Sequence, residues 1–128
     1  MPFCAVQEEF YVFVSFSVPE ESLKELSQGL EEIGGSFVIK GLPHNSFRQL
    51  LQKTKHLKEI GILAPISIDP ESFEYFKVDR VPTFVLKVED SFEKYEGNVP
   101  LFDVLREFSK REGVGEVAKK LLRKGTSP

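Results

Sequence analysis

The sequence of 128 residues contains a single cysteine, Cys4, and no tryptophan. One cysteine excludes an internal disulfide bond and any metal site built from several cysteines. The two histidines, His44 and His56, are also too few for a metal site, because such sites need three or four ligands. We therefore expect no metal and no other cofactor.

The chain also lacks an excess of basic residues and any long apolar run. Its net charge of −3 at pH 7 gives no reason to expect nucleic acid as a partner. No apolar run approaches the roughly 20 residues of a transmembrane helix. The first residues, MPFCAV, carry neither the basic nor the apolar segment of an export signal. We therefore expect that such a signal is absent or has been removed.

What the chain does contain is one domain's length of alternating strand and helix patterns. Residues 10–16 form a nearly continuous apolar run, which is typical of a central strand covered on both faces. Leucines at helical spacing follow, up to the Gly-Gly pair at 34–35, and residues 36–40 are a second strand-like run. A capping box that begins at Ser46 opens a helix expected over 45–60. The apolar face of this helix is expected to carry Phe47, Leu50, Leu51, Thr54 and Leu57.

The second half predicts a short strand, a short helix, a hairpin and two further helices. Asp69 and Pro70 suit the first positions of the short helix, which is expected to end near Lys77. The runs TFVLKV and FEKYE flank EDS and are typical of a hairpin. The last helix is expected over 116–124. The helix before it is expected to turn inward Val99, Phe102, Leu105 and Phe108.

This order of elements predicts an α/β domain whose mixed sheet carries helices on both faces. We expect a flexible N-terminal end at residues 1–9 and the domain itself at residues 10–112. Residues 113–128 are then a C-terminal tail helix and end.

The segment FKVDRVPTFVLKVEDSFEKYEG, residues 76–97, resembles the part of thioredoxins that contains their cis-proline loop. The resemblance implies a thioredoxin-like fold with a cis peptide bond at Val81–Pro82. The bond before proline is the only kind of peptide bond for which the cis form is cheap. The alternative is a trans Val-Pro bond that begins an edge strand, where proline is tolerated.

The same resemblance aligns the redox centre of thioredoxins, Trp-Cys-Gly-Pro-Cys, with Phe16-Ser17-Val18-Pro19-Glu20. Ser17 and Glu20 stand where the cysteines would be, so thiol exchange is excluded at these two positions. We expect instead that Ser17 and Glu20 form a capping box at the start of the first helix. A nucleophilic role for Ser17 is disfavoured, because no activating base accompanies it.

Several blocks taken together resemble a more specific family. FVSFSVPEESL, VIKGLP, IDPESFEYFKVDRVPTFVL and YEGNVPL occur in this order. They are similar to the TrbC-type pilus-assembly proteins of F-type conjugative transfer systems, a class of type IV secretion systems. The resemblance implies a periplasmic location, a role in building the conjugative pilus, and a partnership with another assembly protein, TraW.

We therefore predict a redox-inactive protein-binding module that is not an enzyme. An extended partner segment would pair with the main chain of Val81 as a short strand, and Arg80 would bind an acidic residue of the partner. A bulky polar residue at Val18 or Val81 is expected to weaken binding without unfolding the domain. The predicted partner-binding residues are Phe16, Ser17, Val18, Pro19, Arg80, Val81 and Pro82.

Two alternatives remain open. One is a thiol-disulfide oxidoreductase or isomerase that brings Cys4 to the Pro82 loop. The other is a structural subunit that binds its partner through helix faces or the tail helix. An insulin-reduction assay separates the first alternative from a non-catalytic module, and crosslinking of the partner tests the second.

Overall fold

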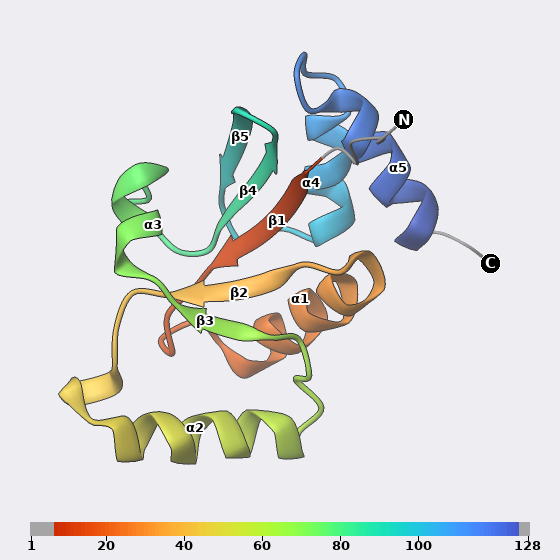
Figure 1. Cartoon of the computed structure of the whole chain (residues 1–128). Coiled ribbons are helices and arrows are strands. Elements are labelled where there is room, and N and C mark those ends of the chain that lie inside the picture. Colours follow the sequence, from red (N-terminus) through yellow and green to blue (C-terminus); the bar gives the residue numbers. More distant parts are fainter. Residues whose placement is uncertain (1–6, 126–128) are drawn as a thin grey trace, which may run out of the picture.

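The computed structural model describes residues 7–125, which form a mixed five-stranded sheet with helices around it. The strand order is β3-β2-β1-β4-β5 (Figure 1). Strands β1, β2 and β3 are parallel, whereas β4 is antiparallel to both β1 and β5. The predicted mixed α/β architecture is therefore confirmed. The strands are β1 (Glu8–Phe13), β2 (Ser36–Ile39), β3 (Ile66–Ile68), β4 (Thr83–Val88) and β5 (Ser91–Glu96).

Helices connect the strands in the order that the sequence predicted. Helix α1 returns the chain from β1 to β2, while α2, β3 and α3 together form the longer connection from β2 to β4. Figure 1 shows α2 set apart from the sheet, on the side where β3 lies. The helices are α1 (Glu20–Ile33), the short 3-10 helix η1 (Pro43–Asn45), α2 (Phe47–Glu59), α3 (Pro70–Tyr75), α4 (Leu101–Phe108) and α5 (Gly115–Gly125).

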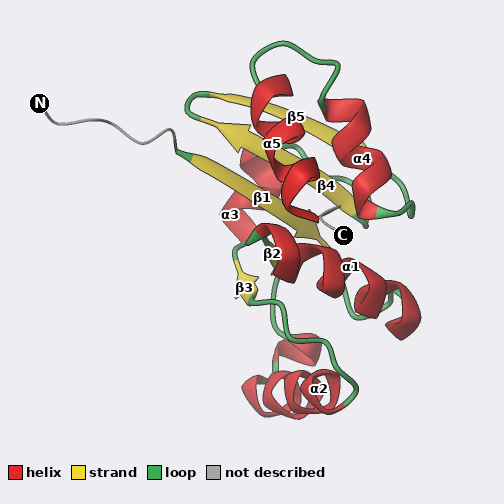
Figure 2. Ribbon diagram, turned by 90° about the vertical axis from the view of Figure 1, so that its right-hand side faces the viewer, coloured by secondary structure: helices red, strands yellow, loops and turns green. Residues whose placement is uncertain are grey.

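The two faces of the sheet are covered by different helices (Figure 2). Because side chains alternate along a strand, Val12 lies in the core beneath α1, α4 and α5, and its neighbour Phe13 lies beneath α3. The ring of Phe13 meets that of Phe73 in α3 edge to face, with centroids 4.9 Å apart. The larger core includes Phe10, Val12, Leu30, Phe84, Leu105 and Phe108.

The start of α1 differs from the prediction. Its N-cap is Pro19, which makes no side-chain capping hydrogen bond, so the predicted capping box of Ser17 and Glu20 is wrong. The Ser17 hydroxyl lies before the helix and is 2.5 Å from the hydroxyl of Ser15. The carboxylate of Glu20 instead approaches α2, where its Oε2 is 3.1 Å from Nε2 of His56.

The caps predicted for α2 and α3 are confirmed. The Ser46 hydroxyl accepts a hydrogen bond from the N–H of Gln49 at 3.2 Å. The Asp69 carboxylate accepts one from the N–H of Ser72 at 3.1 Å. Each cap satisfies a backbone donor that the first turn of a helix leaves without an internal partner.

The apolar face of α2 is buried only in part. Leu50 and Leu57 are buried, but the side chains of Phe47 and Leu51 are 61% and 55% exposed. Phe47 and Leu51, which the sequence placed on the apolar face of this helix, are therefore not part of the core. The reason is the place of α2, because a helix that stands apart from the sheet buries one narrow stripe.

The C-terminal elements follow the prediction closely. The hairpin turn is at Glu89 and Asp90, so Ser91 already belongs to β5. Of the four residues predicted to turn inward, Leu105 and Phe108 are buried in α4, Phe102 is only partly buried, and Val99 precedes the helix. The other two buried residues of α4 are Leu101 and Val104. The predicted tail helix is α5, whose Ala118 and Leu121 join the core beside α1 and α4. The division at residue 113 remains a prediction, and residues 1–6 of the expected flexible end lie outside the described residues.

Candidate functional site

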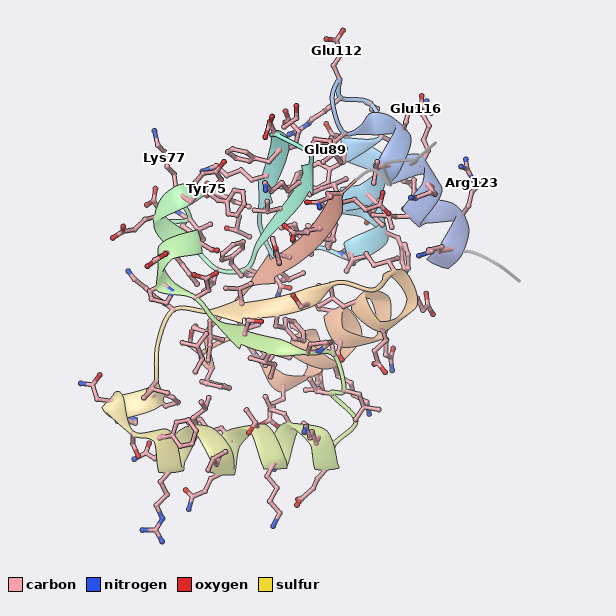
Figure 3. All side chains as sticks on the ribbon, viewed as in Figure 1. Tyr75, Lys77, Glu89, Glu112, Glu116 and Arg123 are labelled. Atoms are coloured by element: carbon pink, nitrogen blue, oxygen red, sulfur yellow. The ribbon has the colours of Figure 1, made fainter. Side chains whose placement is uncertain are left out.

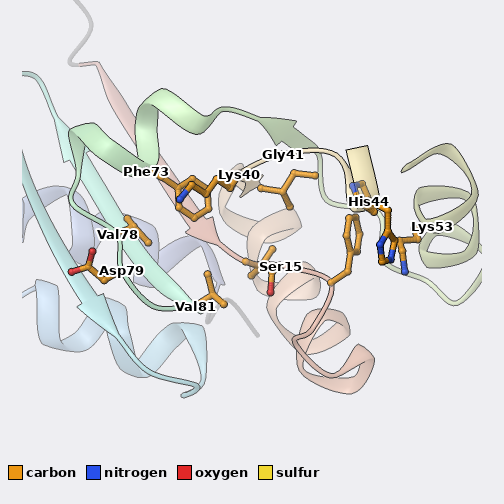
Figure 4. A pocket seen from close by; sticks show the side chains of 13 residues that line it. Ser15, Lys40, Gly41, His44, Lys53, Phe73, Val78, Asp79 and Val81 are labelled. Atoms are coloured by element: carbon orange, nitrogen blue, oxygen red, sulfur yellow. The ribbon is translucent and has the colours of Figure 1, made fainter. Parts of the chain in front are cut away.

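A cavity of about 550 Å³ opens where β1 and β2 end (Figure 4). Parallel strands place the segments that follow them at the same edge of a sheet, and ligands commonly bind there in α/β proteins. Here these segments face η1, α2 and the connection from α3 to β4. The lining residues are Val14, Ser15, Phe16, Ile39, Lys40, Gly41, Pro43, His44, Lys53, Phe73, Val78, Asp79 and Val81.

The end of β1 supplies one wall of the cavity. The predicted strand extended to Phe16, but β1 stops at Phe13. The N–H of Val14 still donates to the carbonyl of Val38 at 2.9 Å, after which the chain leaves the sheet. Ser15 and Phe16 are consequently free of the strand ladder and only partly buried. Both line the cavity, and Phe16 also packs against the edge of the larger core.

The opposite wall is the loop before β4. The Val81–Pro82 peptide bond is cis, as expected from the sequence. The loop is fixed on both sides, because the Thr83 hydroxyl donates to the carbonyl of Arg80 at 2.5 Å and the N–H of Gly97 donates to that of Pro82 at 3.0 Å. Val81 itself is partly exposed and lines the cavity.

The main chain of Val81 is not used by the fold. Among the residues that the structure describes, neither the N–H nor the carbonyl of Val81 has a hydrogen-bond partner. Buried backbone groups are nearly always paired, so such a donor and acceptor beside a cavity are available to a ligand or to water.

The third wall comes from η1 and α2. His44 and Asn45 adopt left-handed backbone angles, with φ of 50° and 54°, which turn the chain from β2 toward α2. Such angles are uncommon for residues other than glycine, although asparagine and histidine are enriched among the exceptions. Lys53 of α2 reaches back over the cavity, where its Nζ lies 5.4 Å from the centre of the Phe16 ring.

Helix α3 is held in place beside the cavity by Asp69. The N–H of Asp69 donates to the carbonyl of Ile39 at 2.9 Å, which ties the start of α3 to the end of β2. Hydrogen bonds from the hydroxyl and the N–H of Ser72 lower the pKa of the Asp69 carboxyl below its ordinary value. On the same face of the sheet, burial raises the pKa of Tyr11, and the nearby Glu9 raises it further.

The structure brings together only part of the predicted partner-binding set. Phe16 and Val81 line the cavity. Ser17, Pro19 and Arg80 are exposed and lie outside the lining. The remaining two, Val18 and Pro82, are buried.

The expectation for Val18 needs correction. Its side chain is 7% exposed and belongs to the larger core. A bulky polar residue there would leave polar atoms without partners in an apolar cluster, which is destabilising. Val81 is thus the position at which binding can be tested apart from folding.

Several lining residues were not predicted. Lys40 was assigned to the second strand, and His44, Lys53, Phe73 and Val78 were not assigned to the site. The signal that would have found Lys40 is its position directly after a strand that runs parallel to β1. Lys53 carried no such signal, because its place depends on how α2 sits against the domain.

The described residues contain no group of three or more His, Cys, Asp or Glu side chains that could hold a metal ion. Nor does any helix within residues 7–125 have the length and apolar character needed to cross a membrane.

Comparison with known proteins gives the family. The family model described as "Type-F conjugative transfer system pilin assembly protein" matches residues 12–119. A curated relative, periplasmic protein TrbC of Escherichia coli (strain K12), is 28% identical over 110 residues, which is 86% of this chain and 52% of that protein. The chain thus spans about half the length of this relative. No solved structure matches the chain. Because the match covers most of its length, the chain belongs to the family of type-F conjugative transfer system pilin assembly proteins.

Proposed function

We propose that this chain is a non-catalytic, thioredoxin-like binding module that holds a segment of another assembly protein while the conjugative pilus is built. Membership of the family supports the role in pilus assembly. The binding mode rests on the cavity between Phe16 and Val81 and on the main chain of Val81.

A thioredoxin-like fold agrees with the topology of the sheet. Strands β2, β1, β4 and β5 are neighbours in that order, with β1 and β2 parallel and β4 antiparallel to β1. The cis peptide bond at Val81–Pro82 directly precedes β4. In this interpretation α2 and β3 are additions between the second strand and α3.

The observation that carries the proposal is the unpaired main chain of Val81. An extended peptide that lies in the cavity can donate to its carbonyl and accept from its N–H, as an added strand does at a sheet edge. Apolar side chains of the same peptide would contact Phe16, Phe73 and Val78. Main-chain pairing supplies affinity in this mode, and the side-chain pocket supplies specificity.

The proposed location is supported by a relative, whereas the proposed partner rests on the resemblance of the sequence to TrbC-type proteins. One relative is named as a periplasmic protein, and we propose the same location for this chain. We propose a TraW-like protein of the same transfer system as the partner.

The absence of catalysis is part of the proposal. Ser17 and Glu20 occupy the positions that resemble the cysteines of a redox centre, and neither side chain supports thiol exchange. The competing proposal, an oxidoreductase that uses Cys4, concerns a residue outside the described part of the chain.

The test compares Val81→Gln with Val117→Gln in the purified chain. Both valines are partly buried, but Val117 lies on α5, away from the cavity. Affinity for the purified TraW-like protein is measured by biolayer interferometry, and stability by thermal unfolding. We expect Val81→Gln to weaken binding by at least about tenfold, a change typical of a central interface residue, and Val117→Gln to leave it unchanged. Equal affinities of the two variants would contradict binding at the cavity. They would indicate that the partner binds to the helix faces or to the tail helix.

A further inference from the structure

One long segment of this chain carries positive charge and no negative charge. Residues 40–58 contain Lys40, Arg48, Lys53, Lys55 and Lys58 and no aspartate or glutamate. The whole chain has 17 basic and 20 acidic residues, so the other residues carry 12 basic against the same 20 acidic ones. An acidic protein thus carries a long basic region, which consists of Lys40 directly after β2, η1, and α2 as far as Lys58. A shorter basic stretch lies in α5, with Lys119, Lys120, Arg123 and Lys124.

The charges of this region are not neutralised by the fold. Within the described residues, no carboxylate lies within ion-pair distance of any of the five cations. Some basic residues elsewhere do pair: Nζ of Lys120 is 2.8 Å from the carboxylate of Glu8, and Arg111 is 2.7 Å from that of Glu93. The region therefore keeps a positive potential toward solvent.

Two of these cations line the cavity beside Val81. Lys40 follows β2 and Lys53 comes from α2, and His44 joins them on the rim. Asp79 is the acidic side chain of the lining, and Figure 4 shows it at the opposite end from Lys53. The end of the cavity near Lys53 thus combines a cation without a carboxylate partner with the apolar ring of Phe16.

We infer that the partner segment carries an aspartate or glutamate next to apolar residues, and that this carboxylate binds Lys53. The inference rests on the proposed function, because it names the chemistry of the segment that the cavity holds. The apolar neighbours of the carboxylate pack on Phe16, Val78 and Val81, while Lys40 adds positive potential. An apolar surrounding strengthens the ion pair, because it excludes water and lowers the local dielectric constant.

The probes are three synthetic peptides that differ in one side chain: acetyl-Leu-Glu-Leu-amide, acetyl-Leu-Gln-Leu-amide and acetyl-Leu-Lys-Leu-amide. Each is titrated into the ¹⁵N-labelled chain, and the amide signals of Gly41, Lys53 and Val81 are followed by NMR. We expect the glutamate peptide to bind about three- to tenfold more tightly than its glutamine isostere, with the lysine peptide weakest. The advantage of glutamate should shrink as the salt concentration rises.

The matched pair of variants is Lys53→Gln and Lys55→Gln. Both remove one charge from α2, but Lys55 is exposed and does not line the cavity. Lys53→Gln should abolish the preference for glutamate over glutamine, and Lys55→Gln should keep it.

Equal binding of the three peptides, or an unchanged glutamate preference in Lys53→Gln, would overturn the inference. So would the absence of any shift at these amides. None of these results would contradict the proposed function. That function is tested separately, by the affinity of Val81→Gln for the partner protein. If Val81→Gln lost partner binding while the three peptides bound equally, the cavity would still be the binding site. Only the inference of an acidic residue in the partner segment would then be rejected.

Discussion

The hydroxyl oxygen of Ser27 accepts two hydrogen bonds, from the N–H of Leu63 at 3.1 Å and from that of Ala64 at 3.0 Å. Ser27 is fully buried on α1, and its hydroxyl also donates to a carboxylate oxygen of Glu31 at 3.3 Å. Leu63 and Ala64 lie between α2 and β3. Ser27 therefore holds the connection between α2 and β3 against α1. This connection links α2, which forms one wall of the cavity, to the sheet.

Replacement of Ser27 by alanine should lower the free energy of unfolding by about 1–3 kcal/mol, because two backbone donors lose their acceptor. Urea denaturation followed by circular dichroism measures this change. Ser67→Ala is the control, since Ser67 is exposed on β3, and its effect should stay within about 0.5 kcal/mol. Equal stability of the two variants would show that the Ser27 hydrogen bonds do not hold this connection.

Replacement of Gly35 by alanine should also destabilise the fold. An added Cβ would lie 2.7 Å from the carbonyl oxygen of Phe10 and 2.7 Å from a methyl carbon of Leu30. Because the Phe10 oxygen is part of the sheet, overpacking of about 1–3 kcal/mol is expected in the same denaturation experiment. Gly41→Ala is the matched control, because no atom lies within 4 Å of its added Cβ. A wild-type midpoint for Gly35→Ala would contradict this packing.

The cap of α3 predicts a dependence of stability on pH. The pKa of Asp69 is lowered in the folded chain, so its contribution is fully present above the ordinary value and is lost as pH falls through the folded value. At neutral pH, Asp69→Ala should cost about 0.5–2 kcal/mol, and the difference from wild type should narrow near pH 2. Asp69→Asn should retain most of the cap at both pH values, because asparagine also accepts from the backbone. A cost of Asp69→Ala that does not change with pH would contradict the charged cap.

The sequence could predict those features that depend on neighbouring residues. The caps at Ser46 and Asp69, the hairpin and the order of helices and strands along the chain are of this kind, because each element is indicated by its own residues. The proposed cap at Ser17 failed for a local reason as well, since α1 begins at Glu20 with Pro19 as its N-cap, so Ser17 lies two residues before the cap position.

The cavity depends on tertiary structure and was predicted only in part. Phe16 and Val81 could be placed together from a resemblance to a known fold. The contribution of Lys53, and the exposure of Phe47 and Leu51, depend on where α2 lies relative to the sheet. Periodicity shows that a helix has an apolar face, but it does not show how much of that face another element covers.

The proposed lack of catalysis predicts an inactive protein in the insulin-reduction assay. With dithiothreitol present, the chain should precipitate insulin no faster than buffer does, because the positions equivalent to the redox cysteines are Ser17 and Glu20. Turbidity at 650 nm is the usual readout. Activity that disappears in Cys4→Ser would favour the Cys4 oxidoreductase, and activity that persists in this variant would contradict both interpretations.

The central claim is that a partner segment lies in the cavity beside Val81, and site-specific photocrosslinking in pilus-producing cells tests it most directly. A photoreactive benzoylphenylalanine replaces Asp79, which is exposed and lines the cavity, or Glu116, which projects from α5 (Figure 3). We predict that position 79 crosslinks to a single assembly protein of the transfer system, and that position 116 does not. Crosslinking from position 116 to the assembly protein, with none from position 79, would contradict the account.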